Sequence, residues 1–227
     1  MEEMREGKAI GLFAVAMLLL ILFAVLNAAI LMVDVQPVGP LGSQVGLATV
    51  NDSIFRNLGT SQFWYEVTET LGKCTLLVAA GFGVAGLIQW IRRKSLFRVD
   101  AGILIMAGLY VVLGVIYLFF EKCIINYRPV LLDGVLEASF PSSHTMLSLC
   151  IWGSALLYFR QYLWNRPART VLTVVCVAAM AVMVVGRLLS GVHWFTDIMG
   201  SIVLSAALVS LYAAMLSIWA EPDLTRQ

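Results

Sequence analysis

The sequence contains only two histidines, and each belongs to a short polar cluster with basic residues nearby. His144 follows Pro141-Ser142-Ser143, whereas His193 stands six residues after Arg187 and four before Asp197. A carboxylate that accepts a hydrogen bond from one imidazole nitrogen makes the other nitrogen the better nucleophile. An arginine binds phosphate oxygens through its planar fork of N–H donors. Together the two clusters therefore predict phosphoryl chemistry.

The cluster around His144 supplies the complementary groups. Proline and serine directly before an apolar run are typical of a helix start, whose free backbone N–H groups bind phosphate well. His144 falls in that first turn, within reach of a bound anion. Arg128 adds a guanidinium fork, and Lys122 adds a compact positive charge near the end of the preceding apolar run.

Each cluster alone has an ordinary structural explanation, such as a histidine that caps a helix or an arginine before a helix-ending proline. Their co-occurrence favours one shared site. A zinc site would use two histidines and a carboxylate but would leave the arginines without a role. We therefore expect a site that needs neither a metal nor a cofactor.

The rest of the sequence is typical of a membrane protein. Hydrophobic residues make up 60% of the 227 residues and charged residues 13%, and the net charge of +1 gives no reason to expect a nucleic-acid partner. A transmembrane helix needs about 20 apolar residues. The sequence predicts an all-α, polytopic membrane protein that forms a single domain over residues 1–227 and has six transmembrane helices. These lie at about 9–33, 67–91, 101–121, 143–162, 168–190 and 195–219.

The basic residues predict how these spans are oriented. Ten of the 15 lysines and arginines fall on one side of the six spans, which the positive-inside rule makes cytoplasmic. They are Arg5, Lys8, Arg92, Arg93, Lys94, Arg98, Arg160, Arg166, Arg169 and Arg226. Both termini are then cytoplasmic, and the motifs within 122–197 face the extracytoplasmic side.

Residues 35–62 form the longest predicted connection, on the extracytoplasmic side. Residues 45–58 within it have mixed polarity. Two interpretations stay open for them: a short amphipathic helix along the membrane interface, or an ordinary connecting loop.

These motifs resemble those of the type 2 phosphatidic acid phosphatase superfamily, membrane lipid phosphatases related to bacterial acid phosphatases and vanadium haloperoxidases. That family carries the patterns Lys-x6-Arg-Pro, Pro-Ser-Gly-His and Ser-Arg-x5-His-x3-Asp. Here Arg128-Pro129 resembles the first, and Pro141 to His144 the second. Arg187, His193 and Asp197 keep the spacing of the third. The resemblance covers roughly residues 100–205.

The resemblance implies a role for each matched residue. His193 would be the nucleophile that forms a phosphohistidine, Asp197 would orient it, and His144 would protonate the leaving oxygen. The phosphate-binding groups would be Lys122, Arg128, Ser142, Ser143 and Arg187.

The implied activity is metal-independent hydrolysis on the extracytoplasmic face of a bacterial plasma membrane. The substrate would be a membrane lipid with a phosphate monoester or pyrophosphate. Undecaprenyl pyrophosphate, phosphatidylglycerol phosphate and phosphatidic acid all fit this description.

Three positions depart from the family pattern. Glu121 stands where the family has lysine, and Lys122 comes one residue later, about 100° further around a helix. The long side chain of Lys122, or Lys73 in the second span, would have to replace that lysine. Ser143 replaces a glycine, and Gly186 replaces a serine.

Two alternatives to a hydrolase stay open. A phosphotransferase would use the same nucleophile and pass the phosphoryl group to another lipid or to a sugar. A catalytically degenerate lipid-binding or transport protein would explain the carboxylate of Glu121 in place of the lysine.

Overall fold

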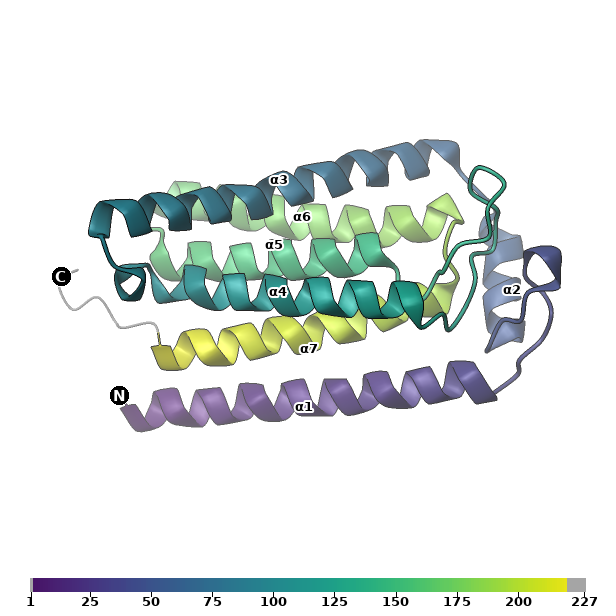
Figure 1. Cartoon of the computed structure of the whole chain (residues 1–227), viewed down its shortest axis with the longest axis horizontal. Helices are drawn as coiled ribbons and strands as arrows, with labels where there is room; N and C mark the ends of the chain where they lie inside the picture. Colours follow the sequence, from purple (N-terminus) through teal and green to yellow (C-terminus); the bar gives the residue numbers. More distant parts are fainter. Residues whose placement is uncertain (1, 220–227) are drawn as a thin grey trace.

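The computed structural model describes residues 2–219, which form a bundle of long helices that run side by side (Figure 1). The α-helices are α1 (Glu2–Met32), α2 (Ala48–Leu58), α3 (Gln62–Arg93), α4 (Ala101–Lys122), α5 (Ser143–Tyr162), α6 (Arg166–Ser190) and α7 (Phe195–Trp219). Two short 3-10 turns, η1 (Pro40–Gly42) and η2 (Leu96–Arg98), lie in the connections. The predicted all-α class is confirmed.

Five of these helices, α1, α3, α4, α6 and α7, are long and apolar enough to cross a membrane. The sixth predicted span forms a helix with the predicted bounds, α5, which is long enough to cross a membrane but is less apolar than these five. Its polar residues are tolerated because α3, α4, α6 and α7 all pack against it. Buried hydroxyl groups at Thr145, Ser148 and Ser154 therefore face protein.

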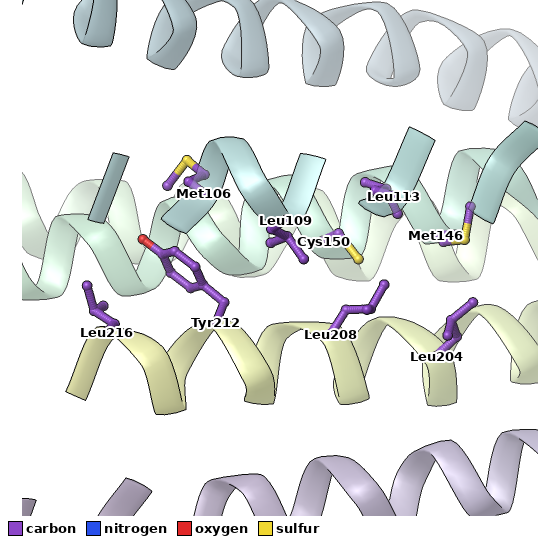
Figure 2. Close-up of a cluster of buried hydrophobic side chains, with 9 residues drawn as sticks. All are labelled: Met106, Leu109, Leu113, Met146, Cys150, Leu204, Leu208, Tyr212 and Leu216. Atoms are coloured by element: carbon purple, nitrogen blue, oxygen red, sulfur yellow. The ribbon is translucent and has the colours of Figure 1, made fainter. Parts of the chain in front are cut away.

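The largest apolar cluster joins α5 to α4 and α7 (Figure 2). It consists of Met106, Leu109, Leu113, Met146, Cys150, Leu204, Leu208, Tyr212 and Leu216. Hydrogen bonds to Thr75 of α3 also hold α5. Trp152 Nε1 donates to Thr75 Oγ1 over 2.9 Å, and Ser148 Oγ lies 3.2 Å from the same oxygen. Helix α5 is thus held by both apolar and polar contacts.

Helices α1 and α7 make the most extensive contact in the bundle. Buried alanines recur along both of them, at Ala9 and Ala16 on α1 and at Ala207 and Ala214 on α7. Small residues let two helix backbones approach closely, which is the main source of attraction between helices in lipid.

The two ends of the bundle differ in composition. Both described termini lie at one end, together with the end of α3 and the start of α6 (Figure 1). The basic residues predicted to be cytoplasmic belong to the helix ends and connections at that end, except Arg226, which lies outside the described residues. At the opposite end lie α2, the 123–142 connection and the turn between α6 and α7.

Helix α2 occupies part of the 35–62 segment. It is attached to the start of α7 through the buried side chain of Asn51. The Asn51 amide nitrogen donates to Thr196 Oγ1 over 2.9 Å, and its oxygen accepts from Thr196 N over 3.1 Å. The Phe55 ring packs edge-on against Trp194, with 5.5 Å between centroids. Helix α2 therefore supports the turn that carries His193.

Candidate active site

His193 lies in the tight turn between α6 and α7. Gly191 ends α6 with a φ of 69°, a left-handed conformation that glycine adopts without strain. A Cβ on Gly191 would also collide with the backbone oxygen of Gly59. Only glycine fits here, and the turn therefore projects His193 from a fixed backbone.

The hydrogen bonds of His193 define which nitrogen is free to react. Its Nδ1 lies 3.0 Å from the Ser139 carbonyl oxygen, which can only accept, so Nδ1 carries the proton. Its Nε2 lies 3.3 Å from Nη1 of Arg128. The lone pair of Nε2 is therefore directed toward a cationic group that would hold a phosphoryl oxygen.

Asp197 acts on His193 mainly through Ser139. The carboxylate oxygen Oδ2 is 3.7 Å from Nδ1, beyond hydrogen-bond distance. It accepts instead from the Ser139 hydroxyl and, over 2.8 Å, from Trp194 N. Ser139 was not predicted from the sequence. It lies two residues before Pro141, and no motif spacing indicates that it connects Asp197 to His193.

The environment of His193 keeps its imidazole neutral. Burial holds the pKa of His193 well below its usual value, and the positive charges of Arg128, Arg187 and His144 lower that pKa further. A neutral imidazole has a free electron pair on Nε2, as a nucleophile requires.

The 123–142 connection brings Arg128 beside His193. Its two arms pair as a short hairpin, in which Arg128 N donates to Glu137 O over 3.1 Å and Ser139 N donates to Asn126 O over 2.9 Å. This pairing places Arg128 and Ser139 against opposite nitrogens of the His193 ring. The Arg128 guanidinium is buried and lies 3.1 Å from the carboxylate of Glu137.

His144 and Arg187 form a second group, joined by Glu69 of α3. One carboxylate oxygen of Glu69 lies 3.0 Å from Arg187 Nη1 and 3.2 Å from His144 Nε2. Arg187 Nη2 lies 3.4 Å from His144 Nδ1. Glu69 was not predicted as a site residue from the sequence, although an acidic residue within an apolar span by itself indicates function.

Helix α3 forms the wall behind this second group. Arg187 is 1% exposed, donates to Thr68 Oγ1 over 3.2 Å, and lies 5.5 Å above the ring centroid of Tyr65. A Cβ added to Gly72 would lie 2.7 Å from the His144 ring. The side chains of both functional residues therefore depend on close contact with α3.

The two serines before His144 have different surroundings. Ser142 is fully buried, and its backbone N–H donates to the Asp197 backbone oxygen over 3.2 Å, while its hydroxyl lies 3.0 Å from that of Thr145. Ser143 lines a small cavity next to His193 and Arg128. Ser142 thus connects the start of α5 to α7, and Ser143 faces the site.

The cavity beside His193 has a volume of about 20 Å³, enough for about one water molecule. Glu121 and Tyr117 of α4 line it, whereas the exposed Lys122 does not. The one-residue shift noted in the sequence therefore turns the carboxylate, and not the lysine, toward the site. Lys73 is also exposed and does not line this cavity.

Two observations complete the description of the site. Within residues 2–219, no group of three or more histidine, cysteine, aspartate or glutamate side chains is placed to hold a metal ion. The structure brings together three of the predicted site residues, His193, Asp197 and Arg128. The other two, His144 and Arg187, lie next to each other.

Residues 118–220 match the model of a family described as the PAP2 superfamily, and these residues include all three motifs. In this stretch the chain is similar to the superfamily of the type 2 phosphatidic acid phosphatases. With its apolar helices, it is a multi-pass membrane protein.

The fold is also similar to a solved structure, that of a transmembrane PAP2-type phosphatidylglycerolphosphate phosphatase from Bacillus subtilis. The two share 16% sequence identity with a TM-score of 0.62, over 88% of this chain and 93% of the other. The search of curated proteins found no match to the sequence.

Proposed function

We propose that this protein is a lipid phosphatase that works through a phosphohistidine at His193 and needs no metal. The observation that carries the proposal is the geometry of the His193 ring. Nδ1 is held by the Ser139 carbonyl oxygen, and the neutral Nε2 lies 3.3 Å from Arg128. The match of residues 118–220 to the PAP2 superfamily supports the same activity.

In the proposed first step, His193 Nε2 attacks the phosphorus while the bond to the leaving oxygen breaks. His144 gives its proton to that oxygen, so the lipid leaves as an alcohol or, from a pyrophosphate, as a monophosphate. Arg128 and Arg187 hold the non-bridging oxygens and stabilise their charge. In the second step, water attacks the phosphorus, His144 takes a proton from it, and the N–P bond breaks to release phosphate.

Glu69 has a supporting role in this mechanism. Arg187 can only donate hydrogen bonds, so its proximity to His144 Nδ1 opposes a proton on that nitrogen. The Glu69 carboxylate offsets this positive charge and accepts from Nε2 on the other side of the ring. We therefore assign Glu69 as the residue that orients the general acid.

The substrate belongs to the same proposal. The apolar helices support a site within a membrane protein, and the positive-inside rule favours the extracytoplasmic face for it. The lipids to test are phosphatidylglycerol phosphate, phosphatidic acid and undecaprenyl pyrophosphate. The similar solved structure is named as a phosphatidylglycerolphosphate phosphatase, so that lipid comes first.

The test is phosphate release from each lipid by purified protein in detergent with EDTA. The wild type should release phosphate, and His193→Ala should be slower by on the order of 10³-fold or more. A control variant, Asn57→Ala, alters an exposed side chain of α2 and should be as active as the wild type. A ³²P-labelled donor should leave acid-labile, base-stable label on the wild type and none on His193→Ala.

Other outcomes would point to the alternatives. Labelled phosphate on an acceptor lipid or sugar would identify a phosphotransferase. No turnover of any of the three lipids would indicate a binding or transport protein. Activity retained by His193→Ala would rule out the proposed nucleophile.

A further inference from the structure

A second, larger cavity lies at the opposite end of the bundle from His193. Its volume is about 930 Å³, and its lining comes from the ends of α3, α5 and α7 and the starts of α4 and α6. Pockets of several hundred Å³ hold small organic groups. None of the motif residues lines this cavity, so the proposed catalytic mechanism leaves it without a role.

The lining is strongly basic. It includes Arg93, Arg166 and Arg169, together with one acidic residue, Asp100. Asp100 is already engaged, since its carboxylate pairs with Arg93 over 3.0 Å and accepts from Gln89 over 2.7 Å. Within residues 2–219, neither Arg166 nor Arg169 forms an ion pair with an acidic side chain. Two arginines therefore face the cavity without an acidic partner among the residues that the structure describes.

The rim of the cavity is aromatic. Phe97, Trp164 and Trp219 line it and are 96%, 61% and 65% exposed. Exposed tryptophans at the ends of membrane helices lie at the level of the lipid headgroups. The cavity thus combines cationic groups with apolar rings at the depth where a phospholipid changes from headgroup to acyl chain.

The floor of the cavity is rigid. The rings of Tyr158 and Tyr162 stack with 4.6 Å between their centroids. The Tyr158 hydroxyl donates to Asp100 over 3.1 Å, and the Tyr162 hydroxyl accepts from Gly102 N over 3.2 Å. These bonds fix α5 against the start of α4, so the cavity keeps its shape without a ligand. Preorganisation of this kind lowers the entropic cost of binding.

We propose that this cavity binds the headgroup of an anionic phospholipid from the leaflet opposite the active site. Arg166 and Arg169 pair with the lipid phosphate, and Trp164 and Trp219 pack against the glycerol and the first part of the acyl chains. Basic pockets between membrane helices suit anionic lipid headgroups in this way. The proposal depends neither on the substrate nor on the catalytic mechanism.

A lipid in this cavity would contact five helices at once. A ligand that binds only the folded state stabilises it, and the stabilisation grows with the logarithm of the ligand concentration relative to Kd. The helices joined here include α5, whose other end carries His144, and α6 and α7, which flank His193. We therefore expect anionic lipid to raise the unfolding temperature of the whole bundle.

The test compares lipid retention by native mass spectrometry in detergent containing phosphatidylglycerol or phosphatidylcholine. The double variant Arg166→Gln/Arg169→Gln should lose retained phosphatidylglycerol by about tenfold or more, the equivalent of about 1.4 kcal/mol. Its matched control is Arg92→Gln/Arg160→Gln, which removes the same charge from the same end but not from the cavity. The control should retain the lipid and the gain in unfolding temperature.

Each other outcome overturns the proposal. Equal losses in both double variants would mean diffuse attraction to the basic end. Equal retention of phosphatidylcholine would mean that the charge plays no part. Displacement of the lipid by excess inorganic phosphate would identify a site for the free anion. Retention that appears only after residues 220–227, with their acidic Glu221 and Asp223, are deleted would make the chain itself the occupant.

Discussion

At the scale of single residues, the nucleophile and its carboxylate are connected by a residue that lies far from both in the sequence. Ser139 holds Nδ1 of His193 with its backbone oxygen and Asp197 with its hydroxyl. The sequence predicted His193 and Asp197 because their spacing is local to one turn. It did not predict Ser139, because that contact depends on how the 123–142 connection folds back.

Glu69 is the residue whose substitution should distinguish acid catalysis from binding. Glu69→Gln should slow phosphate release from an alkyl phosphate lipid by about 10–10²-fold, because the general acid loses its orienting carboxylate. The loss should be much smaller for p-nitrophenyl phosphate, whose phenolate leaves without needing a proton. The two substrates are compared by kcat/KM, which reports the step in which the leaving group departs, and the unfolding temperature is measured alongside.

The control for this prediction is Glu66→Gln, which lies almost one turn earlier on α3, is exposed, and bonds only to Gln62 in the structure. It should leave both rates unchanged. Equal losses of Glu69→Gln on both substrates would show that Glu69 acts on binding or folding and not on the acid.

The surroundings of His193 set the acidic side of the pH profile. Its pKa is held well below the usual 6.5, so the imidazole stays neutral until the pH falls through that lower value. The substrate phosphate itself ionises near pH ~6, so kcat/KM is first corrected for that ionisation. We expect the corrected kcat/KM to fall only when the pH is well below 6.5.

Arg128→Gln provides the complementary measurement. It removes one of the positive charges that lower the pKa of His193, so the acid limb of its residual activity should move to higher pH. An acid limb near the unperturbed value in the wild type, or no movement in this variant, would contradict the assignment of His193 as the group that must be neutral.

At the scale of helices, the sequence predicted the bounds of two helices closely. The bounds of α5 and α7 agree with the predicted 143–162 and 195–219. Helix α3 begins five residues earlier than predicted, at Gln62, because the Ser61 side chain caps it by accepting from Trp64 N. Hydropathy detects only the apolar part of a helix. It therefore could not predict the more polar first turn of α3, which carries Tyr65.

The contact between α3 and α6 explains one departure from the family pattern. Gly186 stands where the family has serine, and a Cβ there would lie 2.8 Å from Thr68 and 2.9 Å from Trp64. Gly186→Ser should therefore lower the stability by about 1–3 kcal/mol, as overpacked cores do, without raising activity. Thermal unfolding in detergent measures this change.

A glycine without close neighbours provides the control for this substitution. Gly114→Ser places a hydroxymethyl group on α4 where a Cβ meets nothing within 4 Å, and it should leave the unfolding temperature nearly unchanged. If Gly186→Ser were as stable as the wild type and more active, the glycine would be a lost catalytic serine and not a packing requirement.

At the scale of the whole molecule, the two ends of the bundle should lie on opposite sides of the membrane. In a variant without the native cysteines, Asp133→Cys in the 123–142 connection should react with a membrane-impermeant maleimide in intact cells. Arg98→Cys at the basic end should react only after the cells are opened. The reverse pattern would place the active site on the cytoplasmic face.

The enclosed position of α5 has a consequence for how the protein is made. A segment enters the bilayer unaided when its own side chains favour lipid, and α5 falls short of the apolarity of its neighbours. Its partners α6 and α7 are synthesised after it. A nascent chain that ends at Tyr162 therefore lacks the surfaces that hold α5 in place. We therefore expect His144 to reach its final position only after α6 and α7 have been synthesised.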